Sequence, residues 1–168
     1  YIDNPNKIEN VGTVGLSPRS CKRMVILKTN LDNEILNFKT FFKLPMQKCF
    51  TNSGSVFLSG GRIEKFDNEN IILSVGDFGF PKYNETDKKI FEKKYNNGRV
   101  LLINLEKGYY KHLSVGHRNT RGLVYVKDKN LIINTEHEPR GEDEINKNYI
   151  NKEYLYIINI SETTRSNT

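Results

Sequence analysis

Short apolar runs that recur at hairpin spacing constrain this chain more than any other feature of its sequence. The runs are rich in Ile, Leu, Val, Tyr and Phe, and clusters of Asn, Asp and Gly separate them. They predict strands at Met24–Leu27, Ile35–Phe42, Ile63–Phe66, Ile71–Val75, Arg99–Leu105, Tyr109–Val115, Leu123–Val126, Leu131–Asn134 and Glu153–Ile160. No long helical pattern interrupts them. The sequence therefore predicts an all-β fold built from antiparallel hairpins.

The charge and hydropathy of the chain narrow the classes of partner. The net charge is +6, but Lys and Arg are scattered among Asn, Asp and Glu instead of gathering along one face with aromatic residues. This pattern argues against a nucleic-acid-binding protein. No apolar run approaches the roughly 20 residues that span a bilayer, so no transmembrane segment is predicted. The charged, aromatic segment Pro81–Asn97 is interpreted as a surface excursion, with a recognition patch as the alternative.

Two polar clusters flank one predicted hairpin in the run Gly116–Asn146, GHRNTRGLVYVKDKNLIINTEHEPRGEDEIN. The turn-forming residues Asp128, Lys129 and Asn130 divide its two strands. Because a hairpin brings its two ends together, the cluster before the first strand is expected to lie beside the cluster after the second. The sequence thus predicts a polar site at one end of a sheet, where loops position functional side chains.

This run closely resembles the soluble pyrroloquinoline-quinone (PQQ) glucose dehydrogenases and their aldose and sorbosone dehydrogenase relatives. Gly116–Leu123 matches that family's GHRNPQGL segment, and Glu136–Asn146 matches its EHGPRGGDEIN-like segment, both without a gap. Two long motifs in the right order are a specific signal. The resemblance implies a six-bladed β-propeller with antiparallel four-stranded blades. Since 168 residues are too few for six blades, we expect a partial propeller over residues 1–160, with a polar tail or the start of the next loop at 161–168 and the rest of the propeller required to complete it.

The same resemblance implies an activity and exposes a departure from it. These enzymes oxidise an aldose at its anomeric carbon, with PQQ as the hydride acceptor and a histidine as the base. Arg62 and Asp77 match the family's HxxGR and Gly-Asp-x-Gly segments, but Leu58 occupies the place of the histidine. Asp77 would then be the residue that normally orients the base, or alternatively a strand-end cap that bonds backbone amides. Leu58 makes sugar oxidation by this chain doubtful.

The resemblance also assigns the cofactor and metal positions. Arg118 and Asn119 match the family's cofactor-contacting pair, and an arginine fork suits an anionic quinone that carries carboxylates. The carbonyls of Glu138 and Pro139 match the ligands of the cofactor's calcium, although the family usually has Gly at the first position. Glu144 matches a ligand of a second, structural calcium.

The histidines of the run are given other roles. His117 is expected to be structural, for example through a hydrogen bond to a loop carbonyl. His137 lies near Glu136 and Asp143 in the sequence, but no His or Cys at metal-ligand spacing completes a transition-metal set. Zinc is therefore not predicted.

Two functions remain open on the sequence alone. The first is a PQQ- and calcium-dependent sugar dehydrogenase, exported to the periplasm or the extracellular space as its family is. The second is a non-catalytic propeller of the same descent that binds a sugar or another protein. In an exported family, Cys21 and Cys49 suggest a disulfide, with two free thiols as the alternative, because spacing alone does not fix their geometry.

Overall fold

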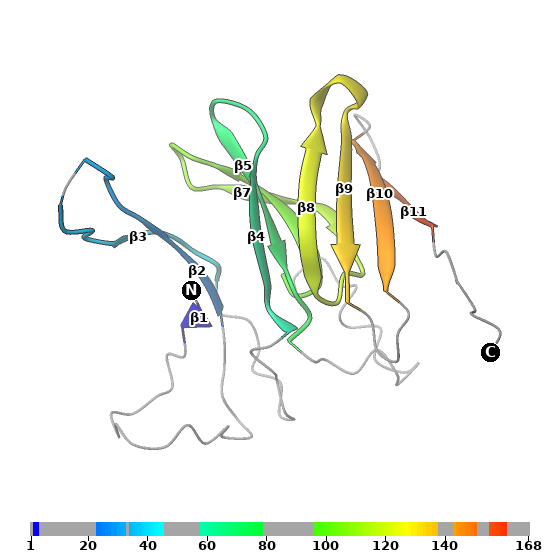
Figure 1. Cartoon of the computed structure of the whole chain (residues 1–168), viewed down its shortest axis with the longest axis horizontal. Helices are drawn as coiled ribbons and strands as arrows, with labels where there is room; N and C mark the ends of the chain where they lie inside the picture. The colour runs from blue at the N-terminus through cyan, green and yellow to red at the C-terminus, as the bar shows by residue number, and fades with distance from the viewer. Residues whose placement is uncertain are drawn as a thin grey trace, which may run out of the picture. The chain divides into compact units, whose positions relative to one another are not determined.

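The computed structural model describes residues 2–3, 23–32, 34–45, 58–78, 96–137, 143–150 and 155–160. Within these residues the chain is built from antiparallel strands with short 3-10 segments, which confirms the all-β prediction (Figure 1). The chain divides into two compact units, residues 1–56 and 57–168. The predictions for Cys21, Cys49, Glu138 and Pro139 concern positions outside the described residues, so they stay predictions.

The first unit holds a three-stranded antiparallel sheet in the order β1 (Ile2–Asp3), β2 (Arg23–Lys28), β3 (Lys39–Lys43). Its buried side chains belong to Met24, Val25, Phe42 and Leu44. The predicted strand Ile35–Phe42 was wrong in its first half, since β3 begins only at Lys39. The reason is a longer turn: Asn30 Oδ1 accepts the Asp32 N–H at 3.1 Å, and Ile35 and Phe38 are 74% and 59% exposed.

The second unit contains two four-stranded antiparallel sheets, each with its strands in sequence order. One sheet consists of β4 (Gly60–Lys65), β5 (Asn70–Val75), β6 (Arg99–Asn104) and β7 (Tyr110–Val115), and the other of β8 (Thr120–Val126), β9 (Leu131–Glu136), β10 (Glu144–Ile150) and β11 (Leu155–Ile160). The two hairpins predicted at 63–75 and 123–134 are thus found, and they belong to different sheets. The 3-10 helix η3 (Lys127–Lys129) makes the turn of the second hairpin, and Asn130 follows it at φ +48°.

Strand β10 was not predicted because it buries polar side chains and exposes apolar ones. Asn146 and Asn148 are 3% and 0% exposed, whereas Ile145 and Tyr149 on the opposite face are 53% and 38% exposed. A strand that buries amides does not show the apolar pattern by which strands are recognised. Its place in the sheet is nonetheless regular, with Asn146 paired to Asn134 of β9.

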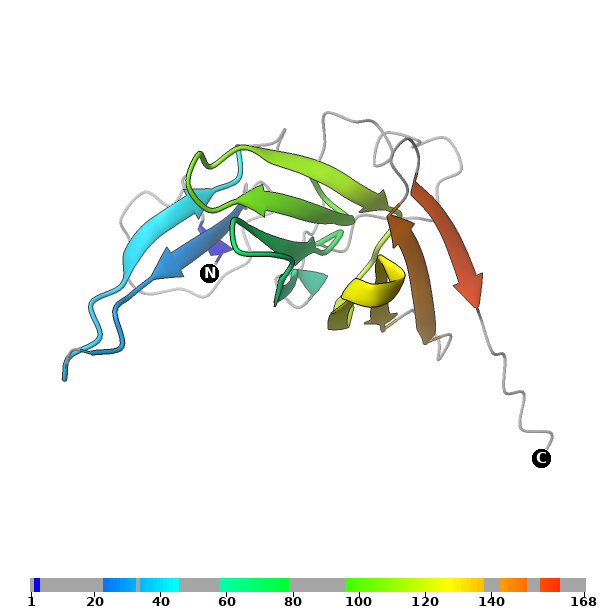
Figure 2. The same ribbon diagram turned by 90° about the horizontal axis from the view of Figure 1, so that it is seen from above.

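An apolar core connects the two sheets of the second unit. Ile72, Val100, Leu102 and Leu113 of the first sheet pack with Ile132 of the second. The rings of Phe66 and Tyr125 stack beside this cluster with centroids 4.4 Å apart. Strands β4 and β8, the first of each sheet, lie side by side, and the later strands fan away from them (Figure 2).

Asp67 builds the turn between β4 and β5. Its Oδ1 accepts the backbone N–H groups of Glu69 and Asn70 at 2.8 and 2.7 Å and the Asn70 side-chain amide at 2.9 Å. Desolvation alone would raise the pKa of Asp67, but these hydrogen bonds and the charge of Lys127 together lower it below the usual 3.8. The turn that the sequence predicted here is therefore held by a carboxylate.

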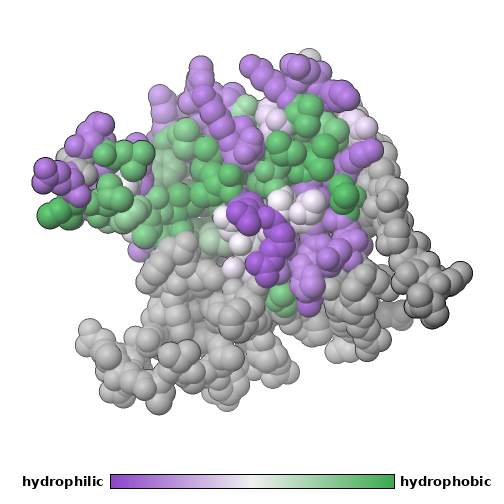
Figure 3. All heavy atoms as spheres, viewed as in Figure 1, coloured by the Kyte–Doolittle hydropathy of each residue, from purple (hydrophilic) through white to green (hydrophobic). Residues whose placement is uncertain are grey.

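Some apolar surface stays open on the second unit. Ile63 on β4 and Val124 on β8 are 50% and 45% exposed, and hydrophobic surface lies over these strands in Figure 3. Among the helices in the described part of the chain, none has the length and apolar character needed to cross a membrane.

Candidate functional site

Backbone hydrogen bonds gather several loops of the second unit at the lower end of Figure 1. Gly98, just before β6, donates its N–H to the Gly76 carbonyl at 3.1 Å, and its own carbonyl accepts the N–H groups of Gly116 and His117 at 3.0 and 3.1 Å. Gly98 has φ +61°, and a Cβ there would lie 2.6 Å from the His117 carbonyl oxygen. Only glycine fits this junction, which joins the loops after β5 and after β7.

The positions that match the base and its orienting residue lie next to each other. The Leu58 carbonyl accepts the Phe78 N–H at 3.0 Å, and a Cβ on Gly76 would lie 2.1 Å from that carbonyl oxygen. Asp77 is 2% exposed, and its N–H donates to the Arg118 carbonyl at 2.9 Å. The structure thus brings together Leu58, Asp77 and Arg118 from separate parts of the sequence. The Asp77–Arg118 bond was not predicted, because it joins the two sheets.

Arg118 is held at three points and still presents part of its guanidinium group. Its N–H donates to Glu136 Oε2 at 2.7 Å, its carbonyl accepts the Asp77 N–H, and one terminal nitrogen donates to the His137 carbonyl at 2.8 Å. Across the described ranges the second terminal nitrogen has no hydrogen-bond partner. A half-buried guanidinium with donors to spare is suited to hold a carboxylate.

Asn119 is more enclosed than its neighbour. It is 1% exposed, and in the amide orientation that satisfies its surroundings its side-chain oxygen accepts from Arg121 Nε and NH2 at 3.2 Å each. Its carbonyl accepts the His137 N–H at 3.3 Å. In this arrangement Asn119 fixes the loop against the segment that follows β9. Contact between Asn119 and a cofactor stays a prediction.

The carboxylate of Glu136 is the centre of a buried polar cluster. Glu136 is 3% exposed, and its Oε1 accepts the side-chain amides of Asn134 and Asn146 at 2.7 and 3.1 Å. The same oxygen contacts His117 Nδ1, while the other oxygen holds the Arg118 backbone. Asn148 extends the cluster by donating to Asn134 Oδ1 at 2.7 Å. Each donor lowers the penalty of burying a charge in this sheet.

His117 is structural, as expected, but its partners are side chains and not a loop carbonyl. It is 1% exposed and lies between Glu136 and Ser114, with its Nε2 2.5 Å from Ser114 Oγ. A carboxylate only accepts hydrogen bonds, so Nδ1 donates to Glu136. In a neutral ring Nε2 is then the acceptor for the Ser114 hydroxyl. From the sequence, Glu136 was considered only as a member of a transition-metal set, and that set was rejected. The sequence signal that could have indicated its role is its position at the end of an apolar strand.

The predicted calcium positions are only partly within the described residues. Glu144 is half-buried and its Oε2 accepts the Asn146 amide at 3.5 Å. His137 and Asp143 form an exposed pair with Nδ1 and Oδ1 3.0 Å apart. Within the parts of the chain that the structure describes, no three His, Cys, Asp or Glu side chains form a metal-binding group. Both calcium sites stay predictions.

A second buried polar cluster lies beside β6. Asn96, 3% exposed, bonds His112 Nε2 at 2.7 Å and the Tyr110 hydroxyl at 3.1 Å. Burial, with the charge of Arg99 as a second cause, lowers the pKa of His112 below its usual 6.5. Burial also lowers the pKa of Arg99 to about 10, which leaves it charged at neutral pH. Asn96 and Asn97 are 3% and 8% exposed, so the predicted surface excursion was wrong at its end, and residues 81–95 lie outside the described residues.

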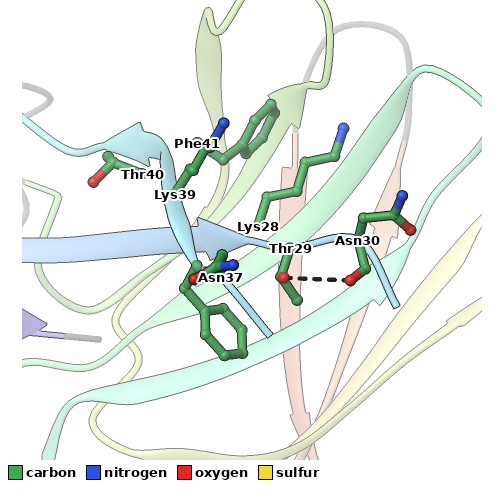
Figure 4. Close-up of a pocket in the computed structure, with 8 residues that line it drawn as sticks. Lys28, Thr29, Asn30, Asn37, Lys39, Thr40 and Phe41 are labelled. Carbon is green, nitrogen blue, oxygen red and sulfur yellow. Dashed lines mark hydrogen bonds between the residues drawn. The ribbon is translucent and has the colours of Figure 1, made fainter. Parts of the chain in front are cut away.

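The first unit has a hollow of its own, which none of the predicted site residues lines. It measures about 870 Å³ and lies along the β2–β3 hairpin (Figure 4). Its lining residues are Lys28, Thr29, Asn30, Asn37, Phe38, Lys39, Thr40 and Phe41. The Lys28 ammonium lies 6.0 Å from the centroid of the Phe41 ring. None of these eight lining residues is a carboxylate or a histidine.

Comparison of the sequence with known proteins finds a matching family and a relative. The family described as glucose/sorbosone dehydrogenase matches residues 17–158. An uncharacterized protein from Synechocystis sp. is 30% identical over 112 residues, which cover 54% of this chain and 27% of that protein.

The chain also matches two solved structures. The soluble aldose sugar dehydrogenase of Escherichia coli, in its apo-form, gives a TM-score of 0.53 at 21% identity over 80% of this chain and 40% of that chain. A glucose dehydrogenase gives 0.46 at 21% identity over 79% and 39%. The chain thus spans less than half the length of each relative. The Escherichia coli structure confirms the fold class, antiparallel four-stranded blades of a β-propeller, while the number of blades stays a prediction.

Proposed function

Because the chain belongs to the glucose/sorbosone dehydrogenase family, we propose that it contributes the Arg118 end of a propeller that binds PQQ and an aldose. The observation that carries this proposal is the geometry of Arg118. Its backbone is fixed by Glu136 and Asp77, while its side chain keeps hydrogen-bond donors for a ligand. A residue held in this way loses little conformational entropy when a ligand binds.

The donor set at this end of the sheets fits an anionic quinone. Arg118 would hold a carboxylate of PQQ, and Asn119 would act from the same loop. When bound, PQQ supplies the acceptor for the hydride that leaves the anomeric carbon of the sugar. The carbonyls of Glu138 and Pro139 would bind the associated calcium, and Glu144 would take part in a second calcium site. Export to the periplasm or beyond belongs to the same proposal.

The chain supplies no base at the position where the family has one. Leu58 carries no group that accepts a proton, although its backbone lies beside Asp77. Loss of a general base slows a reaction by about 10²- to 10⁴-fold. We therefore propose that sugar oxidation by this chain is slow or absent. Leu58 also favours the second candidate function, a non-catalytic propeller that binds a sugar or a protein.

The test of this proposal is dye reduction by the full-length protein, with the rest of the propeller present, in the presence of PQQ, calcium and an aldose. The wild type should show little turnover, and Leu58→His should raise it, because the new imidazole would lie beside Asp77. Leu31→His is the matched control, since Leu31 is 80% exposed in the first unit and its substitution should change nothing. Robust wild-type turnover would overturn the assignment of Leu58 to the base position.

A further inference from the structure

We propose that Glu136 is a positioning residue, which with His117 and Ser114 sets the place of Arg118 for an anionic ligand. This inference rests on the proposed function for the identity of the ligand, PQQ. It assigns to Glu136 a role that acts through Arg118, because the carboxylate is buried and accepts the Arg118 backbone N–H.

The two oxygens of Glu136 perform different tasks. Oε2 accepts the Arg118 backbone N–H at 2.7 Å. Oε1 contacts His117 Nδ1, one residue earlier in the chain. The carboxylate therefore fixes the peptide unit between residues 117 and 118 through two bonds, one to the Arg118 N–H and one to the His117 side chain. The orientation of this peptide determines where the Arg118 side chain begins, so a rotation of Glu136 would move the guanidinium.

Side chains on strands of both sheets hold His117 and Glu136 in place. Ser114 on β7 contacts His117 Nε2 at 2.5 Å, which ties the imidazole to the first sheet. Asn134 on β9 and Asn146 on β10 donate to Glu136 Oε1, which ties the carboxylate to the second sheet. All five residues are buried, between 0% and 4% exposed, so little water competes for these bonds. Regular strands hold a group more accurately than loops do.

The guanidinium group depends on the same carboxylate by a second route. Arg118 donates to the His137 carbonyl at 2.8 Å, and His137 directly follows Glu136 in the chain. The Asn119 carbonyl accepts the His137 N–H at 3.3 Å. The backbone and the side chain of Arg118 are thus both hydrogen-bonded to residues at the end of β9. A purely local role of Glu136 in closing the sheet would not require this convergence.

A double-mutant cycle on PQQ affinity tests the inference. Glu136→Gln keeps the shape but replaces one acceptor by a donor that faces Asn134 and Asn146. We expect it to raise the Kd for PQQ, measured with calcium present, by about 10- to 100-fold in the wild-type background, as loss of a supporting group does. In the Arg118→Ala background the same substitution should change Kd by less than about threefold. An equal factor in both backgrounds would overturn the inference.

A ligand-free measurement separates this inference from the proposed function. If the wild type does not bind PQQ, the proposed function fails, and amide hydrogen exchange then decides the role of Glu136. Glu136→Gln should speed exchange at the Arg118 amide by about tenfold or more while leaving the Leu73 amide unchanged. The control Glu69→Gln, at an exposed turn, should leave both unchanged.

If Glu136→Gln does not fold, a less disruptive substitution still tests the inference. Ser114→Ala removes only the far partner of His117 and leaves the carboxylate intact. Faster exchange at the Arg118 amide in Ser114→Ala would support the inference. An unchanged Arg118 amide in this variant would overturn it.

Discussion

The two four-stranded sheets of the second unit share a topology but differ in what they bury. Strands β5 and β6 of the first sheet bury Ile72, Leu73, Leu101 and Ile103 at 0–1% exposure. At equivalent depth the second sheet buries polar side chains, and these are Asn134, Glu136, Asn146 and Asn148 at 0–3% exposure. The first sheet is thus stabilised mainly by non-directional apolar burial, and the second, which also buries Ile132, has directional hydrogen bonds in addition.

The difference teaches how stability and positioning are divided. An apolar core tolerates small movements because dispersion contacts carry no direction. A buried carboxylate tolerates few movements, because each lost donor leaves a charged group unsatisfied in a medium of low dielectric. Arg118 and Asn119 immediately precede β8, the first strand of the sheet with the polar interior, and Arg118 bonds Glu136 of that sheet. We infer that the apolar sheet mainly stabilises the unit and the polar sheet mainly fixes the site.

The sharpest way to break this comparison is to make the polar sheet apolar at its centre. Glu136→Leu would leave the buried donors of His117, Asn134 and Asn146 without their shared acceptor. The free energy of unfolding should fall by about 3–5 kcal/mol, the usual penalty for removing one member of a buried polar pair. Urea denaturation measures this change. A loss below about 1 kcal/mol would mean that the cluster adds little to the stability of the sheet.

A smaller effect is expected at the junction between the sheets. Gly98→Ala would force an L side chain into φ +61° and bring its Cβ to 2.6 Å from the His117 carbonyl oxygen. The free energy of unfolding should fall by about 1–3 kcal/mol, as is usual for such strain. Gly108→Ala is the matched control, because Gly108 has φ +66° but no atom within 4 Å of its added Cβ. Equal losses in thermal stability would show that backbone strain, and not the close contact, explains the effect.

The smallest effect concerns pH and the cluster around His112. The folded-state pKa of His112 lies below its usual 6.5, so below that pH the unfolded state binds the proton first. The free energy of unfolding should therefore decrease as the pH falls from about 6.5 towards the lower folded-state pKa. Above about pH 6.5, His112 should make it no more dependent on pH. His112→Gln should flatten this part of the pH profile of unfolding. A profile that keeps its slope would assign the dependence to another group.

Much of the fold could be predicted from the sequence because several strands contain a continuous run of apolar residues. Strands β5 and β6 bury such runs, and the two motifs around Arg118 and Glu136 indicated the family. Strand β10 could not be predicted, since it buries Asn146 and Asn148 and exposes Ile145. A buried amide is recognised only when its partners are known, and those partners lie on other strands.

The candidate site shows the same limit. The hairpin from Leu123 to Asn134 indicated that its two flanking segments meet, and the bonds from Arg118 to Glu136 and His137 confirm that they do. The contact of Asp77 with Arg118 was outside the reach of sequence reasoning, because it depends on how one sheet packs beside the next. The role of Glu136 was missed for a similar reason, as its donors come from two strands, β9 and β10, and from the loop that holds His117 and Arg118.

The division of roles between the sheets is tested most directly by measuring stability and PQQ affinity together in two variants. Ile103→Ala, in the apolar sheet, should lower the free energy of unfolding by about 2–5 kcal/mol and leave the Kd for PQQ within about twofold. Arg118→Ala should raise that Kd by about tenfold or more, since bonds to a charged group are lost, and change the stability by about 1 kcal/mol or less. If Ile103→Ala weakens PQQ binding as much as Arg118→Ala does, or if Arg118→Ala leaves binding unchanged, the account is contradicted.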